Sequence, residues 1–208
     1  MPCCLVGSEM CIRDSPSVGA TENIMMAGIT AKGKTIIENA AMEPEISDLA
    51  DTLNKMGSKI NITNKGIIKI TGVKKLNKAN HKIMSDRIVA GTFVIAAVML
   101  NKKFAVKEVD PQNLKALISS LKEMGANIKV EKNIIQILPT TKLKGIKIQT
   151  SPHPGFPTDL QAQMMALMSL AKGNSQIKEN IFENRFMHVP ELNRLGAEIK
   201  VKKDVAYI

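Results

Sequence analysis

One short segment occurs three times in this sequence, and this internal repeat constrains the fold more than any other feature. Each copy has a leucine, an apolar residue three positions later, a glycine, and an apolar residue three positions after the glycine; the copies are residues 53–60, 121–128 and 192–199. The glycines are 68 and 71 residues apart, well beyond the period of about 20–50 residues typical of repeat arrays. We therefore expect one structural unit written three times, each copy able to bury its own core.

An alternating pattern of apolar residues follows each glycine. In the second copy Ile128 and Val130 alternate with polar residues, and a second apolar run, 134–138, comes after a polar turn. Period-two alternation broken by a polar turn is typical of a β-hairpin with one buried face. The same pattern is present in residues 60–70 and 199–208, so we predict a hairpin at the end of each copy.

Two helices are predicted before each hairpin. In the second copy Asp110 can cap a helix, Pro111 can occupy its first turn, and Gly125 can end it in the left-handed conformation. An earlier, more apolar helix and a short strand open each copy; the predicted helices are 20–31, 88–100 and 160–171, and the predicted strands are 35–38, 104–107 and 176–178. Each unit is thus predicted as helix–strand–helix–strand–strand, an α/β fold with helices against a mainly antiparallel or mixed sheet.

Composition argues against two classes of partner. The 208 residues carry a net charge of +10, but there is one Tyr and no Trp, and no aromatic residue is interleaved with a basic run. The stacking surfaces of RNA or single-strand binders are therefore missing, and a lysine-rich solvated surface or an anionic substrate accounts for the charge. No stretch approaches the roughly 20 apolar residues that a membrane span requires. We predict neither a nucleic-acid partner nor a membrane partner.

The first fifteen residues lack the repeat pattern and contain all three cysteines, Cys3, Cys4 and Cys11. They also lack the basic start and long apolar stretch of a secretory signal. We expect residues 1–15 to be a non-native leader, an artefact of cloning, with neither a disulfide framework nor a metal site. The absence of cysteine elsewhere suits a reducing cytoplasm. The three histidines have no spacing typical of metal ligands, so we predict no metal and no cofactor.

Polar side chains gather where the first helix of each copy begins. They are Ser17 with Val18 and Gly19 in the first copy, Asp86 and Arg87 in the second, and Thr158 and Asp159 in the third. Helix N-termini present free N–H groups and about half a positive charge, which suits phosphates and carboxylates. If the copies are related by rough symmetry, these starts face one cleft that binds a small polyanionic substrate. The alternative is ordinary capping, with Ser85 as a cap and Thr158 with Gln161 as a capping box.

The second unusual segment is 182–192, which replaces the strand-to-helix connection of the other copies. Its polar residues include Glu183, Arg185 and His188, and we expect them to pack around Phe186 and Met187. A functional loop is one interpretation. The other is a capped, buried turn with an internal Glu–Arg ion pair.

Together these segments resemble the UDP-N-acetylglucosamine 1-carboxyvinyltransferase family of enolpyruvyl transferases. Five motifs in the same order carry the resemblance: residues 17–21, 38–46, 86–93, 152–163 and 183–192. The resemblance runs from residue 16 to residue 208, about half of a full-length member. It implies part of a fold with two inverse α/β domains, each of three repeats about a pseudo-threefold axis. Residues 16–82 would then be the last repeat of the first domain, and residues 83–208 two repeats of the second.

The resemblance also implies a reaction. The enolpyruvyl group of phosphoenolpyruvate moves to the 3′-hydroxyl of UDP-N-acetylglucosamine and phosphate is released, the first committed step of peptidoglycan precursor synthesis. By position, Asp159 matches the carboxylate beside that hydroxyl, a candidate general base. The other matching positions bind the sugar nucleotide (Ser17, Val18, Gly19, Ile181 and Arg185) or support the cleft (Asp86, Arg87, Glu43, Glu45, Thr158 and Glu183).

Departures from the family pattern leave alternatives open. The family's catalytic cysteine loop precedes the position of Ser17 and has no counterpart here, so we expect this chain alone to be inactive, with poor solubility or a partly ordered first segment. A catalytically dead paralogue that binds the sugar nucleotide is one alternative. A shikimate-pathway enolpyruvyl transferase is another, although that family lacks the Asn-Arg-Phe-Met-His-Val string of residues 184–189. A nucleic-acid-binding domain rests on charge alone.

Overall fold

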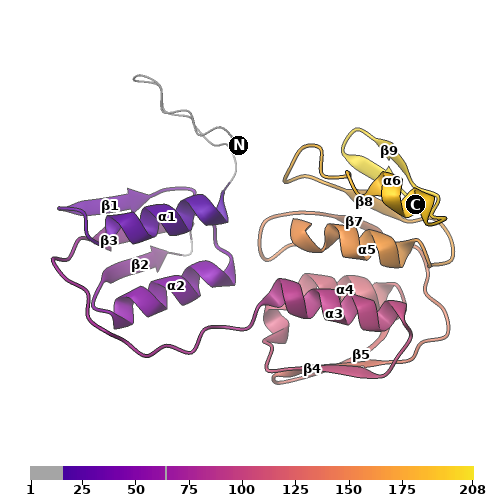
Figure 1. Ribbon diagram of the computed structural model, residues 1–208, viewed down its shortest axis with the longest axis horizontal. Helices are drawn as coiled ribbons and strands as arrows, with labels where there is room; N and C mark the ends of the chain where they lie inside the picture. Colours follow the sequence, from indigo (N-terminus) through magenta and orange to yellow (C-terminus); the bar gives the residue numbers. More distant parts are fainter. Residues whose placement is uncertain (1–15, 64) are drawn as a thin grey trace. The chain divides into compact units, whose positions relative to one another are not determined.

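The computed structural model of the chain describes residues 16–63 and 65–208. The chain divides into two compact units between Ile83 and Met84. The first unit carries one copy of the repeat and the second carries two (Figure 1). The predictions for residues 1–15 and their three cysteines lie outside the described residues.

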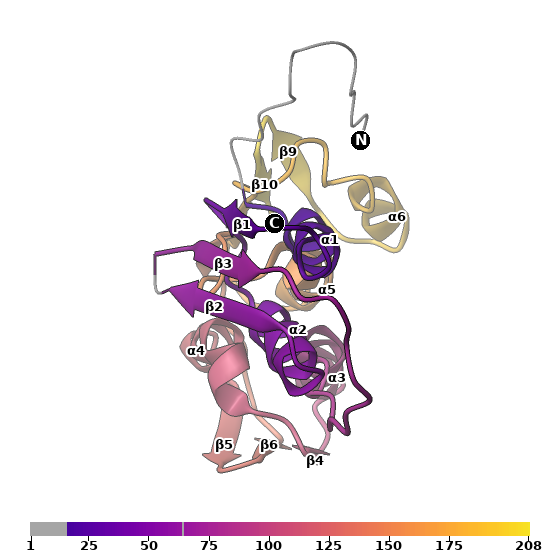
Figure 2. The same cartoon turned by 90° about the vertical axis from the view of Figure 1, so that its left-hand side faces the viewer.

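The first unit consists of a three-stranded sheet and two helices. Its elements are α1 (Val18–Gly28), β1 (Lys34–Ile37), α2 (Pro44–Lys55), β2 (Lys59–Thr63) and β3 (Ile67–Thr71). The strands pair antiparallel in the order β1-β3-β2. Figure 2 shows the sheet on one side of this unit and both helices on the other. The core between the two layers includes Met25, Ile46 and Ile68, which are at most 1% exposed.

The second copy repeats this arrangement within the second unit. Its elements are α3 (Arg87–Met99), β4 (Phe104–Lys107), the 3-10 helix η1 (Pro111–Leu114), α4 (Lys115–Glu123), β5 (Asn127–Glu131) and β6 (Ile134–Leu138). The sheet order is β4-β6-β5 and every pairing is antiparallel. As in the first unit, the last strand of the copy therefore lies in the middle of its sheet.

The third copy has the same frame with one added strand. Its elements are β7 (Lys147–Gln149), the 3-10 helix η2 (Thr158–Leu160), α5 (Gln161–Met168), β8 (Gln176–Lys178), α6 (Val189–Arg194), β9 (Lys200–Lys202) and β10 (Val205–Tyr207). The sheet order is β7-β8-β10-β9, with β7 parallel to β8 and the other pairings antiparallel. The sheet is therefore mixed, and the sequence did not predict β7.

The repeated glycine follows the second helix of each copy and turns the chain into the hairpin. Gly57, Gly125 and Gly196 have φ angles of 98°, 99° and 99°. This is the left-handed region that glycine enters without a steric cost. The prediction that Gly125 ends its helix in this conformation is confirmed, and so is capping by Asp110, which accepts the N–H of Gln112 at 3.0 Å.

In two of the copies an asparagine side chain stabilises this turn with two hydrogen bonds. The Asn54 side chain accepts the backbone N–H of Ile60 and donates to the carbonyl of Ile60, both at 2.9 Å. Asn193 makes the same two hydrogen bonds with Ile199, at 2.9 and 3.0 Å. The second copy has Lys122 in this position, so these hydrogen bonds stabilise the turn without being required for it.

Helices α3 and α5 pack together, and the two copies of the second unit share one core. Gly91 permits the close approach, because a Cβ at that position would lie 2.6 Å from Leu160 Cδ1. Gln163 Nε2 also donates to Thr92 Oγ1 at 3.1 Å. The beginnings of α3 and of η2–α5 are therefore side by side. Buried residues from both copies, such as Leu117 and Met164, form a single apolar cluster.

The predicted order helix–strand–helix–strand–strand is confirmed in all three copies, with shifted boundaries. The helix predicted over 20–31 is α1, which ends at Gly28, and the helix predicted over 160–171 is α5, which ends at Met168. Within the described part of the chain, no helix has both the length and the apolar character needed to cross a membrane.

Candidate functional site

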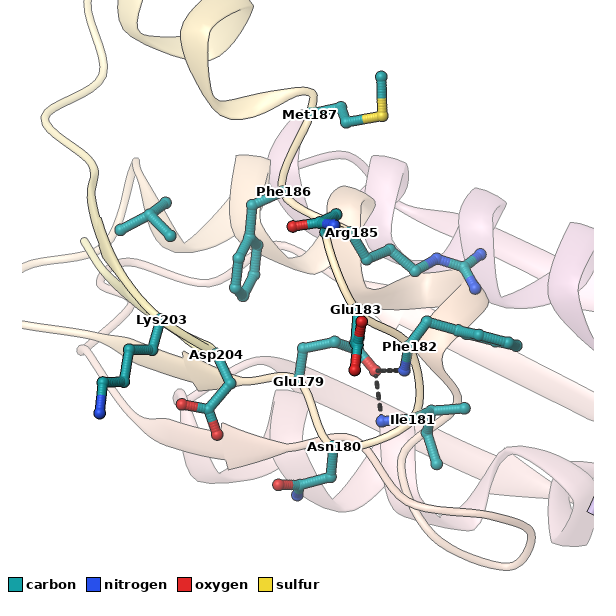
Figure 3. A pocket seen from close by; sticks show the side chains of 12 residues that line it. Glu179, Asn180, Ile181, Phe182, Glu183, Arg185, Phe186, Met187, Lys203 and Asp204 are labelled. Atoms are coloured by element: carbon teal, nitrogen blue, oxygen red, sulfur yellow. Dashed lines mark hydrogen bonds between the residues drawn. The ribbon is translucent and has the colours of Figure 1, made fainter. Parts of the chain in front are cut away.

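The loop after β8 and the β9–β10 hairpin enclose a cavity of about 680 Å³. It is lined by residues 179–187 of the loop and by Val201, Lys203 and Asp204 of the hairpin. Figure 3 shows Phe186 pointing into the cavity, with Lys203 and Asp204 on the side facing the loop. The lining therefore combines aromatic surface with charges of both signs, as in sites for small polar ligands.

At one edge of this cavity, Arg185 forms an ion pair with Asp159. Arg185 Nη2 lies 2.6 Å from Asp159 Oδ1, and the two side chains are 36% and 54% exposed. Asp159 lies in the first turn of the helical segment η2–α5, where the helix dipole favours a negative charge. Among the described residues, the second oxygen, Asp159 Oδ2, accepts no hydrogen bond. One carboxylate oxygen is thus held in place and the other faces solvent.

The aromatic ring of Phe182 contacts the guanidinium of Arg185. The guanidinium carbon lies 5.0 Å from the centroid of the Phe182 ring, within the range of a cation–π contact. Arg185 is therefore held by a carboxylate at its end and an aromatic ring at its face. Because a guanidinium has five N–H donors, the contact with Asp159 leaves others for a ligand.

This arrangement corrects two expectations for the loop. The internal Glu–Arg pair is wrong, because the partner of Arg185 is Asp159 of η2 rather than Glu183. The expectation that polar groups pack around Met187 is also wrong, because Met187 is 85% exposed. Phe186 does pack against the core of the second unit. The loop is therefore a lining of the cavity instead of a buried turn.

A buried carboxylate, Glu179, lies beneath the loop at the end of β8. It is 4% exposed. Its Oε1 accepts hydrogen bonds from Thr150 Oγ1 at 2.7 Å and from the backbone N–H groups of Ile181 and Phe182 at 2.9 and 3.3 Å. Its Oε2 accepts one from Thr158 Oγ1 at 2.8 Å. Two of these bonds are drawn in Figure 3.

His188 lies at the end of the loop, half-buried before α6. Burial lowers the pKa of His188 below its ordinary value of 6.5, because removal from water disfavours the charged imidazolium. Its Nε2 is buried without a hydrogen-bond partner among the described residues. The ring is therefore a neutral packing element at neutral pH.

The helix starts of the second unit are occupied by local hydrogen bonds, and these correct two capping assignments. Asp86, not Ser85, caps α3 and accepts the N–H groups of Ile88 and Val89 at 2.8 and 3.0 Å. Thr158 does not form a capping box with Gln161, because its hydroxyl donates to Glu179. Arg87 is buried in the first turn of α3.

The remaining predicted site residues lie in the first unit. Ser17 caps α1 and accepts the N–H of Ala20 at 3.3 Å, followed by Val18 and Gly19 in the first turn. Glu43 and Glu45 flank Pro44 at the start of α2. Thr21 Oγ1 accepts the N–H of Ala41 at 3.1 Å, so the segment before α2 is tied to the start of α1.

The structure therefore brings some of the predicted residues together and leaves others separate. In the second unit, Asp159, Ile181, Glu183 and Arg185 belong to one neighbourhood, and Thr158 joins it through Glu179. Sequence analysis missed Glu179. The available signal was a charged residue after the strand where the other copies have Ala40 and Val109. No group of three or more potential metal ligands occurs among residues 16–63 and 65–208.

Comparison with known proteins identifies relatives of this chain. The chain is 53% identical over 197 residues to UDP-N-acetylglucosamine 1-carboxyvinyltransferase 2 of Carboxydothermus hydrogenoformans, covering 94% of this chain and 47% of that protein. It is 51% identical over 195 residues to UDP-N-acetylglucosamine 1-carboxyvinyltransferase 1 of Caldanaerobacter subterraneus, with the same coverage. The chain thus spans about half the length of the curated relatives it matches.

The fold has a counterpart among solved structures. The enolpyruvyl transferase NikO from Streptomyces tendae superposes with a TM-score of 0.80 at 23% identity, covering 91% of this chain and 46% of that one. Residues 10–208 match the family described as EPSP synthase (3-phosphoshikimate 1-carboxyvinyltransferase). The match includes all three repeats and the loop that carries Arg185. The chain therefore belongs to the EPSP synthase (3-phosphoshikimate 1-carboxyvinyltransferase) family of enolpyruvyl transferases.

Proposed function

We propose that this chain forms the sugar-nucleotide side of an active site that transfers the enolpyruvyl group of phosphoenolpyruvate to the 3′-hydroxyl of UDP-N-acetylglucosamine. In this reaction the hydroxyl oxygen bonds to the central carbon of phosphoenolpyruvate, and the bond from that carbon to the phosphate oxygen breaks. The relatives that are about half identical to the chain carry the name of this activity. The product would enter peptidoglycan precursor synthesis in the cytoplasm, and so cell-wall biogenesis, cell shape and cell division.

The ion pair between Asp159 and Arg185 is the observation that carries this proposal. Arg185 holds one oxygen of the carboxylate at 2.6 Å, which leaves Oδ2 to accept the proton of a substrate hydroxyl. A general base must lie within hydrogen-bond reach of the proton it removes, and an anchored carboxylate meets this condition better than a free one. Asp159 is therefore assigned as the base that orients and deprotonates the 3′-hydroxyl.

Arg185 and Ile181 are assigned to the nucleotide sugar. The guanidinium keeps donors that suit a diphosphate, and Ile181 lies in the same cavity lining. Ser17, Val18 and Gly19 are assigned to the uridine diphosphate at the start of α1. Supporting roles in the cleft go to Asp86, Arg87, Glu43, Glu45, Thr158 and Glu183. In this proposal the first unit is the last repeat of one domain, and the second unit is two repeats of another.

Titration calorimetry with UDP-N-acetylglucosamine tests the proposal. We expect saturable binding that Arg185→Ala weakens by about tenfold or more, equivalent to about 1.4 kcal/mol. Arg194→Ala is the matched control, because Arg194 forms a similar pair with Glu191 at 2.9 Å but is 77% exposed and lies outside the cavity. Equal effects of the two variants would contradict the assignment of Arg185.

Two further measurements separate the alternatives. Saturable binding of 3-phosphoshikimate in place of the sugar nucleotide would overturn the proposed substrate and favour a shikimate-pathway enzyme. Phosphate release on addition of both phosphoenolpyruvate and the sugar nucleotide tests the expectation that this chain alone is inactive, and turnover would refute it. In a full-length transferase that contains this segment, Asp159→Asn should retain binding and lose phosphate release, since an amide cannot accept the proton.

A further inference from the structure

Glu179 occupies a position that the other two copies fill with an apolar residue. Each of the three residues donates its backbone N–H to the residue just before the last strand of its copy: Ala40 to Gly66 at 2.8 Å, Val109 to Asn133 at 3.4 Å, and Glu179 to Asp204 at 2.8 Å. Their exposed fractions are 4%, 2% and 4%. The frame of the repeat is therefore compatible with an apolar side chain here, and the third copy departs from it.

A carboxylate in such a place costs free energy unless hydrogen bonds replace its hydration. Glu179 accepts four hydrogen bonds, two from the hydroxyls of Thr150 and Thr158 and two from the backbone N–H groups of Ile181 and Phe182. Three of these bonds go to Oε1 and one goes to Oε2, so each oxygen of the carboxylate has a partner. Bonds to a charged acceptor are also stronger than neutral ones.

The four donors come from segments that are distant in the sequence and that meet at the candidate site. Thr158 immediately precedes Asp159. Phe182 carries the ring that supports Arg185. Asp159 and Arg185 are 26 residues apart, and the Glu179 carboxylate is hydrogen-bonded to the segments of both.

We propose that Glu179 is a positioning residue that fixes the Asp159 segment and the Arg185 loop relative to each other. Its part in ligand binding rests on the function proposed above, whereas its part in ordering the loop does not. Glu179 does not touch the reacting atoms in this assignment. It acts through Thr158 on the base and through Ile181 and Phe182 on the loop that binds the nucleotide.

Three variants test this inference on the full 208-residue chain. Glu179→Val introduces the kind of side chain that the second copy has at Val109, and it removes all four acceptor interactions. Glu179→Gln keeps the shape and one carbonyl oxygen for the two backbone donors, so it is the conservative rescue. Glu191→Gln is the control, because it neutralises a carboxylate that is 67% exposed and lies outside the cavity.

The readouts are amide hydrogen exchange at Ile181 and Phe182 and affinity for UDP-N-acetylglucosamine. We expect Glu179→Val to remain folded, with exchange at both amides faster by about tenfold and affinity lower by about tenfold. Glu179→Gln should recover most of the protection at both amides, and Glu191→Gln should change neither readout. Unchanged exchange and affinity in Glu179→Val would overturn the inference.

Failure of the inference and failure of the proposed function give different results. If the chain does not bind the sugar nucleotide, the proposed function fails, and amide exchange alone decides whether Glu179 orders the loop. If Glu179→Val does not fold, Thr158→Val and Thr158→Ser decide the question. Thr158→Val removes one donor and should lower affinity, and Thr158→Ser should restore it. Equal affinity for those two variants would contradict a path through Thr158.

Discussion

The second and third copies share one frame and differ most in the connection between the first strand and the second helix. Both have the same order of their three common strands, β4-β6-β5 and β8-β10-β9. In the second copy a short stretch joins β4 to η1, whereas in the third copy residues 179–188 join β8 to α6, and residues 179–187 of this connection line the cavity. The strands and the helices that cover them therefore carry the fold, and the connection carries the residues assigned to chemistry.

The helix after this connection buries fewer apolar side chains in the third copy than in the second. In the second copy α4 buries Leu117, Ile118 and Leu121, whereas in the third copy α6 buries only Val189. Leu195, just beyond α6, is 85% exposed. Apolar burial is the main stabilising contribution to folding. The third copy therefore has less apolar packing in the helix that follows the cavity-lining segment.

The largest effect that would sharpen this comparison is expected from the repeated leucine. Leu121→Ala should lower the free energy of unfolding by about 2–5 kcal/mol, because the side chain is 0% exposed and its loss leaves a cavity. Leu192→Ala, at the same repeat position but half-buried, should cost clearly less. Urea unfolding of both variants measures the difference, and equal losses would mean that the two copies are packed alike.

The repeated glycine should give a smaller effect that is similar in the two copies. Gly125→Ala and Gly196→Ala place a Cβ at φ of 99°, which costs about 1–3 kcal/mol. Gly125→Ala should be the worse of the two, because its Cβ would lie 3.2 Å from the Lys142 carbonyl oxygen, whereas at Gly196 no non-neighbouring heavy atom of the described residues would lie within 4 Å. Thermal unfolding checks the order, and a larger effect at Gly196 would contradict it.

A cap should contribute about 1 kcal/mol. Asp86→Ala removes the acceptor of two backbone N–H groups at the start of α3, whereas Asp86→Asn keeps an oxygen in the same place. We expect the first variant to lower the urea midpoint and the second to have little effect. A similar loss in both variants would show that the charge of Asp86 matters more than its hydrogen bonds.

The ion pair of the site should contribute little to stability despite its short distance. Asp159 and Arg185 are 54% and 36% exposed, and exposed pairs contribute about 0.2–1 kcal/mol. A double-mutant cycle with Asp159→Asn and Arg185→Ala measures this coupling. A coupling well above this range would indicate that the pair holds the third copy together and would weaken its assignment to ligand binding.

The smallest effect is expected from the pH dependence that His188 gives the third copy. Because burial lowers the pKa of His188 below 6.5, the unfolded chain binds a proton more readily than the folded one. The contribution of the neutral ring is complete above about pH 6.5 and is lost as the pH falls from there towards the lowered pKa. Unfolding midpoints of the unmodified chain and of His188→Gln between pH 7.5 and pH 5 measure this; parallel profiles would exclude a role for His188.

The local structure of each copy follows from its own residues. The glycine that ends the second helix, the cap at Asp110 and the alternating hairpins involve residues a few positions apart, so their signals are readable in a short window. Even at this short range, Ser85 was predicted as the cap of α3, whereas the structure has Asp86 there. Neighbouring polar residues offer equal capping chemistry, so the sequence does not distinguish them. The relation between this chain and enolpyruvyl transferases was also readable, since it rests on motifs in a fixed order.

The assembly of the candidate site, in contrast, depends on contacts between remote residues. In the folded chain the partner of Arg185 is Asp159 rather than Glu183, β7 pairs with β8, and Glu179 accepts hydrogen bonds from two distant segments. None of these contacts has a local signal, because each depends on where the packing of α3 against α5 and the pairing of the third sheet bring remote residues. A short-range pattern specifies which elements form, and the burial of their shared apolar faces specifies which side chains meet.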